Sequence, residues 1–247
     1  MREDIPDWFK LTDIATLETM RRVSDAVASN NLDLQIKNSP ILAHWFVLDT
    51  LFLANRANRD GMHANALALT RQCVEAISII ELGICGHPEA NLVLLKWEQD
   101  QVTPGNLRAW LQNNLWEKYG SGLWNESWAV FMREFAKAIQ PYAHYGRDLA
   151  QWQVKLHSVN GNKALLEMKP HAYDPQKATR ITLYHALLTY VLGRLWLITN
   201  HDDQFEELIY RLGDALGKSR YLDGHATNWS QQFWAMLWDS TGNTILE

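Results

Sequence analysis

The strongest constraint on the fold is a helical spacing of apolar residues that runs through most of the chain. In the first segment these residues fall near one stripe: Ile14, Leu17, Met20 and Val23. Ser39-Pro40 and Thr103-Pro104 each combine a capping residue with Pro at the first helical position, which marks the start of a helix. We therefore expect a mainly α fold, a single-domain helical bundle of about eight to nine helices.

The individual helices can be placed by this spacing and by the residues that interrupt it. We expect the first to be capped by Thr12-Asp13 and the third to be closed by Gly83 and Gly86. A further helix begins at Thr103-Pro104. The other predicted ranges are 12–29, 39–57, 60–82, 88–100, 125–140, 175–200, 203–217 and 228–240.

The stretch Gln153 to Lys169 departs from the helical pattern. Val154 and Leu156 alternate with polar residues, as in a half-buried strand. Asn160-Gly161 is a dipeptide typical of two-residue hairpin turns. The sequence thus predicts a small β-hairpin over residues 153–169 that protrudes from the helical body.

Composition limits the classes of partner. The chain has 247 residues, no Gly/Ser linker and a net charge of -5, so we treat residues 1–247 as one domain without an overall basic field. A nucleic acid would need a local basic patch. Cys73 and Cys85 lie twelve residues apart and read as free thiols of a reducing compartment. The apolar run Ile41 to Ala54 is too short to span a bilayer, so we expect a cytoplasmic protein with no membrane partner.

The segment Pro141 to Asp148 concentrates reactive side chains between two predicted helices. Histidine exchanges protons near neutral pH and arginine offers a fork for phosphate or carboxylate, so His144 and Arg147 are candidate catalytic residues. Tyr142 and Tyr145 are candidate substrate-binding residues. The alternative is a structural turn, in which His144 satisfies backbone groups and Arg147 pairs with Asp148 or Glu75.

Arg71 and Glu75 form a second candidate binding pair on the predicted helix 60–82. At positions i and i+4 both side chains lie on one face, and the helix around them is apolar. A charged pair that is partly buried is costly unless it is well satisfied, which makes it a candidate for function. The alternative is an ordinary salt bridge within the helix.

Other signatures of chemistry do not occur in the sequence. It contains no phosphate-binding glycine loop, no His-Glu-x-x-His and no Gly-x-Ser-x-Gly motif. Its histidines and carboxylates lack a recognisable metal-ligand spacing. We therefore expect neither a metal site nor a cofactor.

Arg180 and His185 carry a resemblance to a known family. An Arg, a short spacer and a His on a late helix of a small helical domain is similar to the motif of HEPN ribonucleases. The resemblance implies a homodimer that cleaves RNA without metal, with Arg180 steadying the scissile phosphate and His185 assisting proton transfer. The same kind of spacing also occurs at three other places: Arg56/His63, Arg194/His201 and Arg220/His225.

A broader resemblance involves the first two candidate sites. The pattern of Leu67, Arg71 and Glu75 is similar to uncharacterised bacterial helical families that are grouped near HEPN. So is the later aromatic-then-His segment, here Tyr142-Ala-His144. This resemblance supports the Arg71 helix and the Pro141 to Asp148 segment as neighbours in one site.

Three hypotheses follow. The first is a HEPN-like, RNA-cleaving toxin or defence-system component that forms a homodimer. The second is a non-catalytic helical scaffold that binds a protein partner through an aromatic-rich surface. That surface would lie on the last predicted helix, which carries Trp229, Trp234 and Trp238. The third is a small-ligand enzyme that uses His144 and Arg147 on an anionic substrate.

Overall fold

The computed structural model describes residues 6–29, 39–168, 171–219, 221–222 and 229. The prediction of a mainly helical fold with one small hairpin is confirmed. The predicted helix 228–240 lies outside the described residues, apart from Trp229. The elements are α1 (Asp7–Ser29), α2 (Ser39–Arg59), α3 (His63–Ile84), α4 (Ala90–Glu98), α5 (Pro104–Asn114), η2 (Trp116–Tyr119), α6 (Trp128–Ile139), η3 (Gln140–Tyr142), α7 (Arg147–Gln151), β1 (Lys155–Asn160), β2 (Lys163–Glu167), α8 (Pro175–Thr199) and α9 (Asp203–Gly217).

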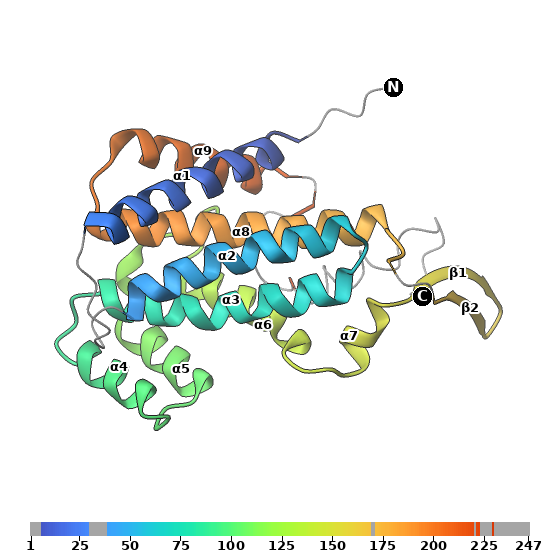
Figure 1. The fold of residues 1–247 in the computed structure, drawn as a ribbon, viewed down its shortest axis with the longest axis horizontal. Coiled ribbons are helices and arrows are strands. Elements are labelled where there is room, and N and C mark those ends of the chain that lie inside the picture. Colours follow the sequence, from blue (N-terminus) through green and yellow to red (C-terminus); the bar gives the residue numbers. More distant parts are fainter. Residues whose placement is uncertain (1–5, 30–38, 169–170, 220, 223–228, 230–247) are drawn as a thin grey trace.

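Helix α8 is the central helix of the bundle, and α1, α2, α3 and α9 pack against it (Figure 1). Its 25 residues are long and apolar enough to cross a membrane, but 72% of its most apolar window is buried inside the protein. A helix that is apolar on all sides is typical of a buried core element. The other long helices therefore cover α8 and keep most of it away from water.

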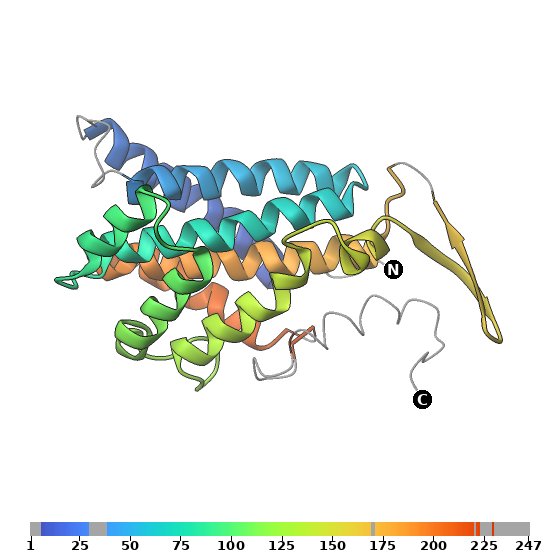
Figure 2. The same ribbon diagram turned by 90° about the horizontal axis from the view of Figure 1, so that it is seen from below.

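Helices α2 and α3 form a long hairpin that lies along α8 (Figure 2). Gly61 lies in the turn between them with a φ of +76°, a conformation that favours glycine. A Cβ at this position would lie 2.8 Å from the backbone of His171, so the turn also packs against the segment that precedes α8.

Two predicted helix boundaries were wrong. Helix α1 begins at Asp7 rather than at the expected Thr12 cap, because Trp8 and Leu11 belong to the core and extend the helix toward the N-terminus. Thr12 Oγ1 donates to the Trp8 carbonyl at 2.6 Å, inside the helix. At the other end of the hairpin, α3 passes through Gly83 and ends at Ile84.

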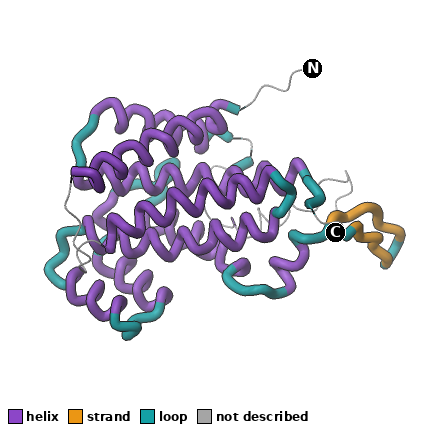
Figure 3. Tube along the Cα trace, viewed as in Figure 1, coloured by secondary structure: helices purple, strands orange, loops and turns teal. Residues whose placement is uncertain are grey.

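The predicted β-hairpin is confirmed, but its turn lies one residue later than expected. Strands β1 and β2 are antiparallel, and they extend away from the helical body (Figure 3). Asn160 pairs with Lys163, so the two turn residues are Gly161 and Asn162 rather than Asn160 and Gly161. Gly161 has a φ of +58°, which a turn of this length requires.

The aromatic residues of α6 and α8 pack into one cluster in the core. Phe131 lies 5.5 Å from Trp229 and 6.1 Å from Tyr190, ring centre to ring centre. Trp229 is fully buried in this cluster, which corrects its expected place on a partner-binding surface. Trp234 and Trp238 lie outside the described residues.

The close approach of α3 to the start of α2 generates a test of the packing. A Cβ at Gly83 would lie 2.1 Å from Pro40 Cγ, so Gly83→Ala forces the two helices apart. We expect a loss of about 1–3 kcal/mol in the free energy of unfolding, measured in urea. Gly105→Ala is the matched control, because its nearest neighbour is 4.0 Å away and its stability should be unchanged or higher.

Candidate functional site

The predicted site residues divide into a buried and an exposed group. His144, Tyr145 and Arg147 are exposed, and Glu75 is half-buried. The other four are buried: Arg71, Tyr142, Arg180 and His185. They come from α3, η3, α7 and α8 and from the segment between η3 and α7, and the surroundings of each decide what it can do.

Arg71 is the centre of a polar cluster where α3 meets η3. Its Nη2 lies 2.9 Å from Glu75 Oε1 and donates to Gln140 Oε1 at 2.8 Å. The predicted pair is therefore formed, between a buried cation and a half-exposed carboxylate. Nε and Nη1 of Arg71 are buried without a hydrogen-bond partner among the described residues. An unsatisfied buried donor is costly, so this side chain is available for a further contact.

Gln140 links Arg71 to a second arginine. Arg108 of α5 donates from Nη2 to the same Gln140 oxygen at 3.4 Å. The pKa of Arg108 is lowered by burial and by the positive charge of Arg71, while Glu75 raises it. Two guanidinium groups thus converge on one neutral amide oxygen, an arrangement that a bound anion would stabilise.

A basic pocket of about 290 Å³ lies between α5 and α6 beside Gln140. Arg133 and Lys137 contact the carboxylate of Glu134 at 3.2 and 3.6 Å. The three cations that line this basic pocket are Arg108, Arg133 and Lys137. Three cations beside one carboxylate give the pocket a positive charge, which suits phosphate or another anion.

The Pro141 to Asp148 segment lies next to this cluster. Both η3 and α7, which flank the segment, contact α3, the helix that carries Arg71, as the sequence suggested. Tyr142 is buried against Trp152, with ring centres 5.8 Å apart. Burial raises the pKa of Tyr142 above its usual range.

The polar residues that follow Tyr142 face outward. His144 and Arg147 are exposed, and the hydroxyl of Tyr145 donates to Gln153 Oε1 at 3.3 Å. Among the described residues, Arg147 forms no ion pair with Asp148 or with Glu75. These are the two partners that a purely structural turn would have given it. His144 and Arg147 are thus accessible to a ligand.

Arg180 and His185 lie in different surroundings on α8. Arg180 is close enough to Tyr142 for its charge to favour the ionised tyrosine, so it belongs to the η3 side. His185 Nε2 lies 2.8 Å from Thr70 Oγ1, and the imidazole lines a pocket of about 240 Å³ between α1 and α2. Burial lowers the pKa of His185 to about 4. The charge of Arg180 therefore acts on Tyr142, whereas His185 contacts Thr70.

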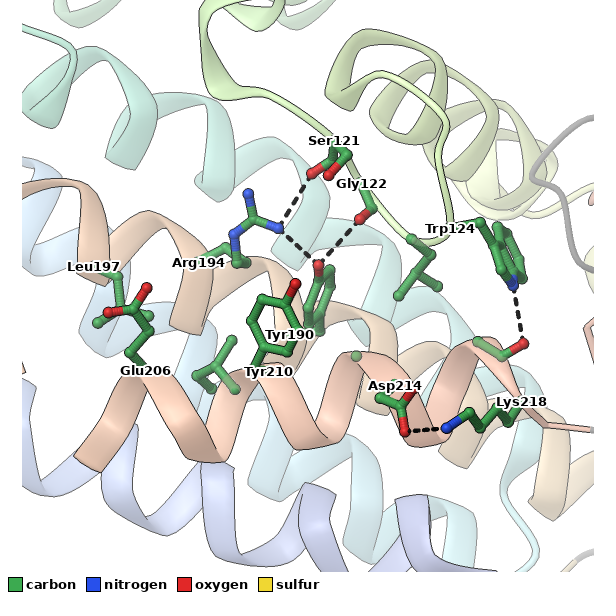
Figure 4. A pocket seen from close by; sticks show the side chains of 14 residues that line it. Ser121, Gly122, Trp124, Tyr190, Arg194, Leu197, Glu206, Tyr210, Asp214 and Lys218 are labelled. Atoms are coloured by element: carbon green, nitrogen blue, oxygen red, sulfur yellow. Dashed lines mark hydrogen bonds and ion pairs between the residues drawn. The ribbon is translucent and has the colours of Figure 1, made fainter. Parts of the chain in front are cut away.

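A larger pocket of about 470 Å³ lies between α8, α9 and the loop 121–124 (Figure 4). Arg194 donates to the Ser121 carbonyl at 3.1 Å and to the Tyr190 hydroxyl at 2.7 Å, and Tyr190 donates to the Gly122 carbonyl. These contacts hold the loop on α8. Arg194 is therefore mainly a structural residue, and the pocket offers less to an anion than the basic pocket does.

One cluster of metal-ligand residue types occurs at the start of α9. Ligand atoms of His201, Asp203 and Glu206 lie within 4.8 Å of one another, and all three side chains are exposed. The positive end of the α9 dipole disfavours a cation there. Asp202 caps the helix by accepting from the Phe205 N–H at 2.9 Å.

Sequence reasoning missed the residues that make the basic pocket. Arg133, Lys137 and Gln140 follow one another at spacings of four and three residues, so a face of positive and polar groups could have been noticed. Arg108 lies on another helix, α5, and no local spacing connects it to them.

The buried His185 gives a prediction for the pH dependence of stability. Its pKa in the folded protein, about 4, is below that of an unfolded chain, so the unfolded state binds more protons as the pH falls from about 6.5 to 4. Acidification over this range should therefore remove about 2–3 kcal/mol of stability through His185 alone.

The measurement compares the free energy of unfolding of the natural protein and of His185→Gln between pH 7 and pH 4. Glu81, whose pKa burial raises to about 8, shifts the pH dependence in the opposite direction, but it is common to both proteins and cancels in the difference. Equal slopes for the two proteins would contradict the assignment.

Comparisons with family models, with curated proteins and with solved structures find no match for this chain. The expected resemblance to HEPN ribonucleases therefore rests on the spacing of Arg180 and His185, and the broader one to uncharacterised helical families rests on the segments of Arg71 and His144. A function for the protein has to follow from the chemistry of its own side chains.

Proposed function

We propose that this protein binds RNA at the basic pocket between α5 and α6, and that His144 assists metal-independent cleavage of the bound strand. The observation that carries the proposal is the amide of Gln140. Its oxygen accepts hydrogen bonds from the buried Arg71 and from Arg108 at the pocket. This amide joins the pocket to the Arg71/Glu75 pair.

The charge of the region supports a phosphate ligand. Four cations lie around Gln140: Arg71, Arg108, Arg133 and Lys137. The carboxylates in contact with these cations are those of Glu75 and Glu134. The chain as a whole is acidic, so this local excess is what a phosphate backbone needs in order to bind. Trp116 also lines the pocket, although it is buried, so the walls are apolar as well as charged.

The reach of His144 supports a role in cleavage. It is four residues from Gln140, so the Cα atoms of the two residues lie within about 14 Å of each other. The imidazole would take the proton of a ribose 2′-hydroxyl, whose oxygen then forms a bond to phosphorus. The bond from phosphorus to the 5′ oxygen breaks, and water returns a proton to that oxygen. Arg147, three residues on, steadies the phosphate.

A second candidate function is that of a scaffold for a protein partner. It is favoured by a row of large apolar side chains on the outer face of α2, which the core does not cover. The row lies on a different helix from the basic pocket, so both functions can coexist on one chain.

RNA binding can be tested with two of the cations that line the basic pocket. We expect Arg108→Gln/Lys137→Gln to lower the affinity for a single-stranded RNA by roughly tenfold and to reduce the salt slope of binding by about one to two, because two phosphate contacts are lost. Fluorescence anisotropy over a range of salt concentrations measures both quantities. Lys10→Gln removes an exposed charge on α1 and is the matched control. An unchanged affinity in the double variant would contradict the site.

Cleavage is tested separately, in the presence of a chelator. The natural protein should cut the RNA, and His144→Ala should lose cleavage by at least about a hundredfold while it keeps its affinity, because only proton transfer is removed. His201→Ala, which removes another exposed histidine, should cut as the natural protein does. If RNA binds but stays intact, the binding proposal stands and the catalytic role of His144 fails.

A further inference from the structure

The outer face of α2 carries a row of large apolar side chains that Asp49 divides into two groups. Its large apolar members are 42% to 55% exposed: Leu42, Trp45, Phe46, Phe52 and Leu53. They recur with the spacing of one helical stripe, and the exposed charges Asp49 and Arg56 lie on the same stripe. We call these seven residues the α2 stripe. Figures 1 and 2 both place α2 at the outside of the bundle.

The α2 stripe is not needed for the core of the monomer. The opposite side of α2 supplies Val47, Leu48 and Leu51 to the core, and these side chains are almost fully buried. Single exposed apolar residues are normal on a protein surface, but five large ones on one helix face, in two groups on either side of Asp49, mark an interaction surface. The row therefore needs an occupant that covers it.

The apolar surface widens on both sides of the stripe. Toward α4 and α5, Leu42 and Phe46 line a groove of about 610 Å³ together with Ile79 and Trp97. Toward α1, Phe52 lines the pocket that also contains Leu17. A helix laid along α2 would thus meet apolar walls on either flank, as in helix packing of ridges into grooves.

The charges of the stripe identify the occupant. Asp49 and Arg56 are seven residues apart, about 10.5 Å along the helix, so they cannot pair with each other. Neither takes part in an ion pair among the described residues. Each lies equally far from the midpoint between Phe52 and Leu53. A helix with this arrangement is complementary to an antiparallel copy of itself.

We propose that α2 packs antiparallel against α2 of a second copy of this chain, about a two-fold axis that passes between Phe52 and Leu53. In this register Asp49 faces Arg56 of the partner subunit, and the reciprocal pair forms on the other side of the axis. Phe52 and Leu53 of both copies form the apolar centre between the two ion pairs. Arg59, which is exposed, then lies over the ring of Phe46 of the partner subunit. The guanidinium and the face of the aromatic ring attract each other in this arrangement.

Other registers are disfavoured by charge. A two-fold axis at Asp49, or a parallel pairing of the helices, would bring two Asp49 carboxylates together in apolar surroundings, which costs several kcal/mol. The proposed register avoids this repulsion and gives both charges a partner. It also leaves the basic pocket on α5 and α6 outside the contact, so the dimer does not depend on RNA binding.

The experiment is a charge exchange in the full chain, read by sedimentation equilibrium. The natural protein should form dimers, and Phe52→Glu should abolish them. Asp49→Arg and Arg56→Asp should each raise the dimer dissociation constant by at least about tenfold, because each sets like charges against each other. The double variant Asp49→Arg/Arg56→Asp should recover the natural dissociation constant to within about threefold, because the pairs re-form with reversed sign.

Controls separate the interface from the fold. All the substituted residues are exposed, so circular dichroism should show the natural helix content for each variant. Glu207→Arg reverses an exposed charge on α9 and should leave the dissociation constant unchanged. A monomer at every concentration overturns the assignment of a second copy and leaves the stripe to a different protein. Dimers of Phe52→Glu, or a double variant as weak as the single ones, overturn the location or the register.

Discussion

Burial of α8 is the constraint on which the rest of the structure depends. An apolar helix of 25 residues has to be covered along nearly its whole length, and α1, α2, α3 and α9 provide that cover. The polar groups that α8 carries into the interior then need partners. Thr189 shares a hydrogen bond with Thr16 at 2.9 Å, and the Ala178 carbonyl accepts from Asn58 at 3.0 Å. The same bonds fix how α1 and α2 lie on α8.

Lys177 shows how the buried helix also positions the segment around the candidate site. Its ammonium group donates to the carbonyls of Gln151, Trp152 and Val154, at the end of α7 and the base of the hairpin. A buried cation held by three carbonyls has hydrogen-bond acceptors that offset the cost of its burial. It anchors the chain just after the segment of Tyr142, His144 and Arg147. The exposed polar residues of that segment are thus presented from a fixed base.

The basic pocket and the α2 stripe lie at the edge of this framework, where the helices do not have to bury their side chains. The pocket forms where α5 and α6 meet beside η3, and its cations are supplied by two helices that are distant in the sequence. The stripe lies on the face of α2 that points away from α8. A protein that binds RNA at one surface and its own copy at another would have two sites on one rigid bundle.

Much of the fold could be predicted because the residues that begin, continue and end a helix lie close together in the sequence. The cap at Thr103 is formed, with its side chain accepting from the Asn106 N–H, and α9 has the predicted bounds Asp203–Gly217. Boundaries failed where tertiary contacts outweighed local signals. Helix α1 extends back to Asp7 because Trp8 is needed in the core, and Gly83 stays helical because its missing side chain makes room for Pro40.

The sequence by itself determined the helical class, the hairpin and the Arg71/Glu75 pair, because each depends on residues a few positions apart. Only the tertiary structure decided that Gln140 and Arg108 complete the surroundings of Arg71, and that Arg180 and His185 lie in different environments. It also decided which face of the apolar helix α2 stays exposed. Helical spacing records which residues share a face, but not which neighbour covers that face, and that depends on contacts between distant parts of the chain.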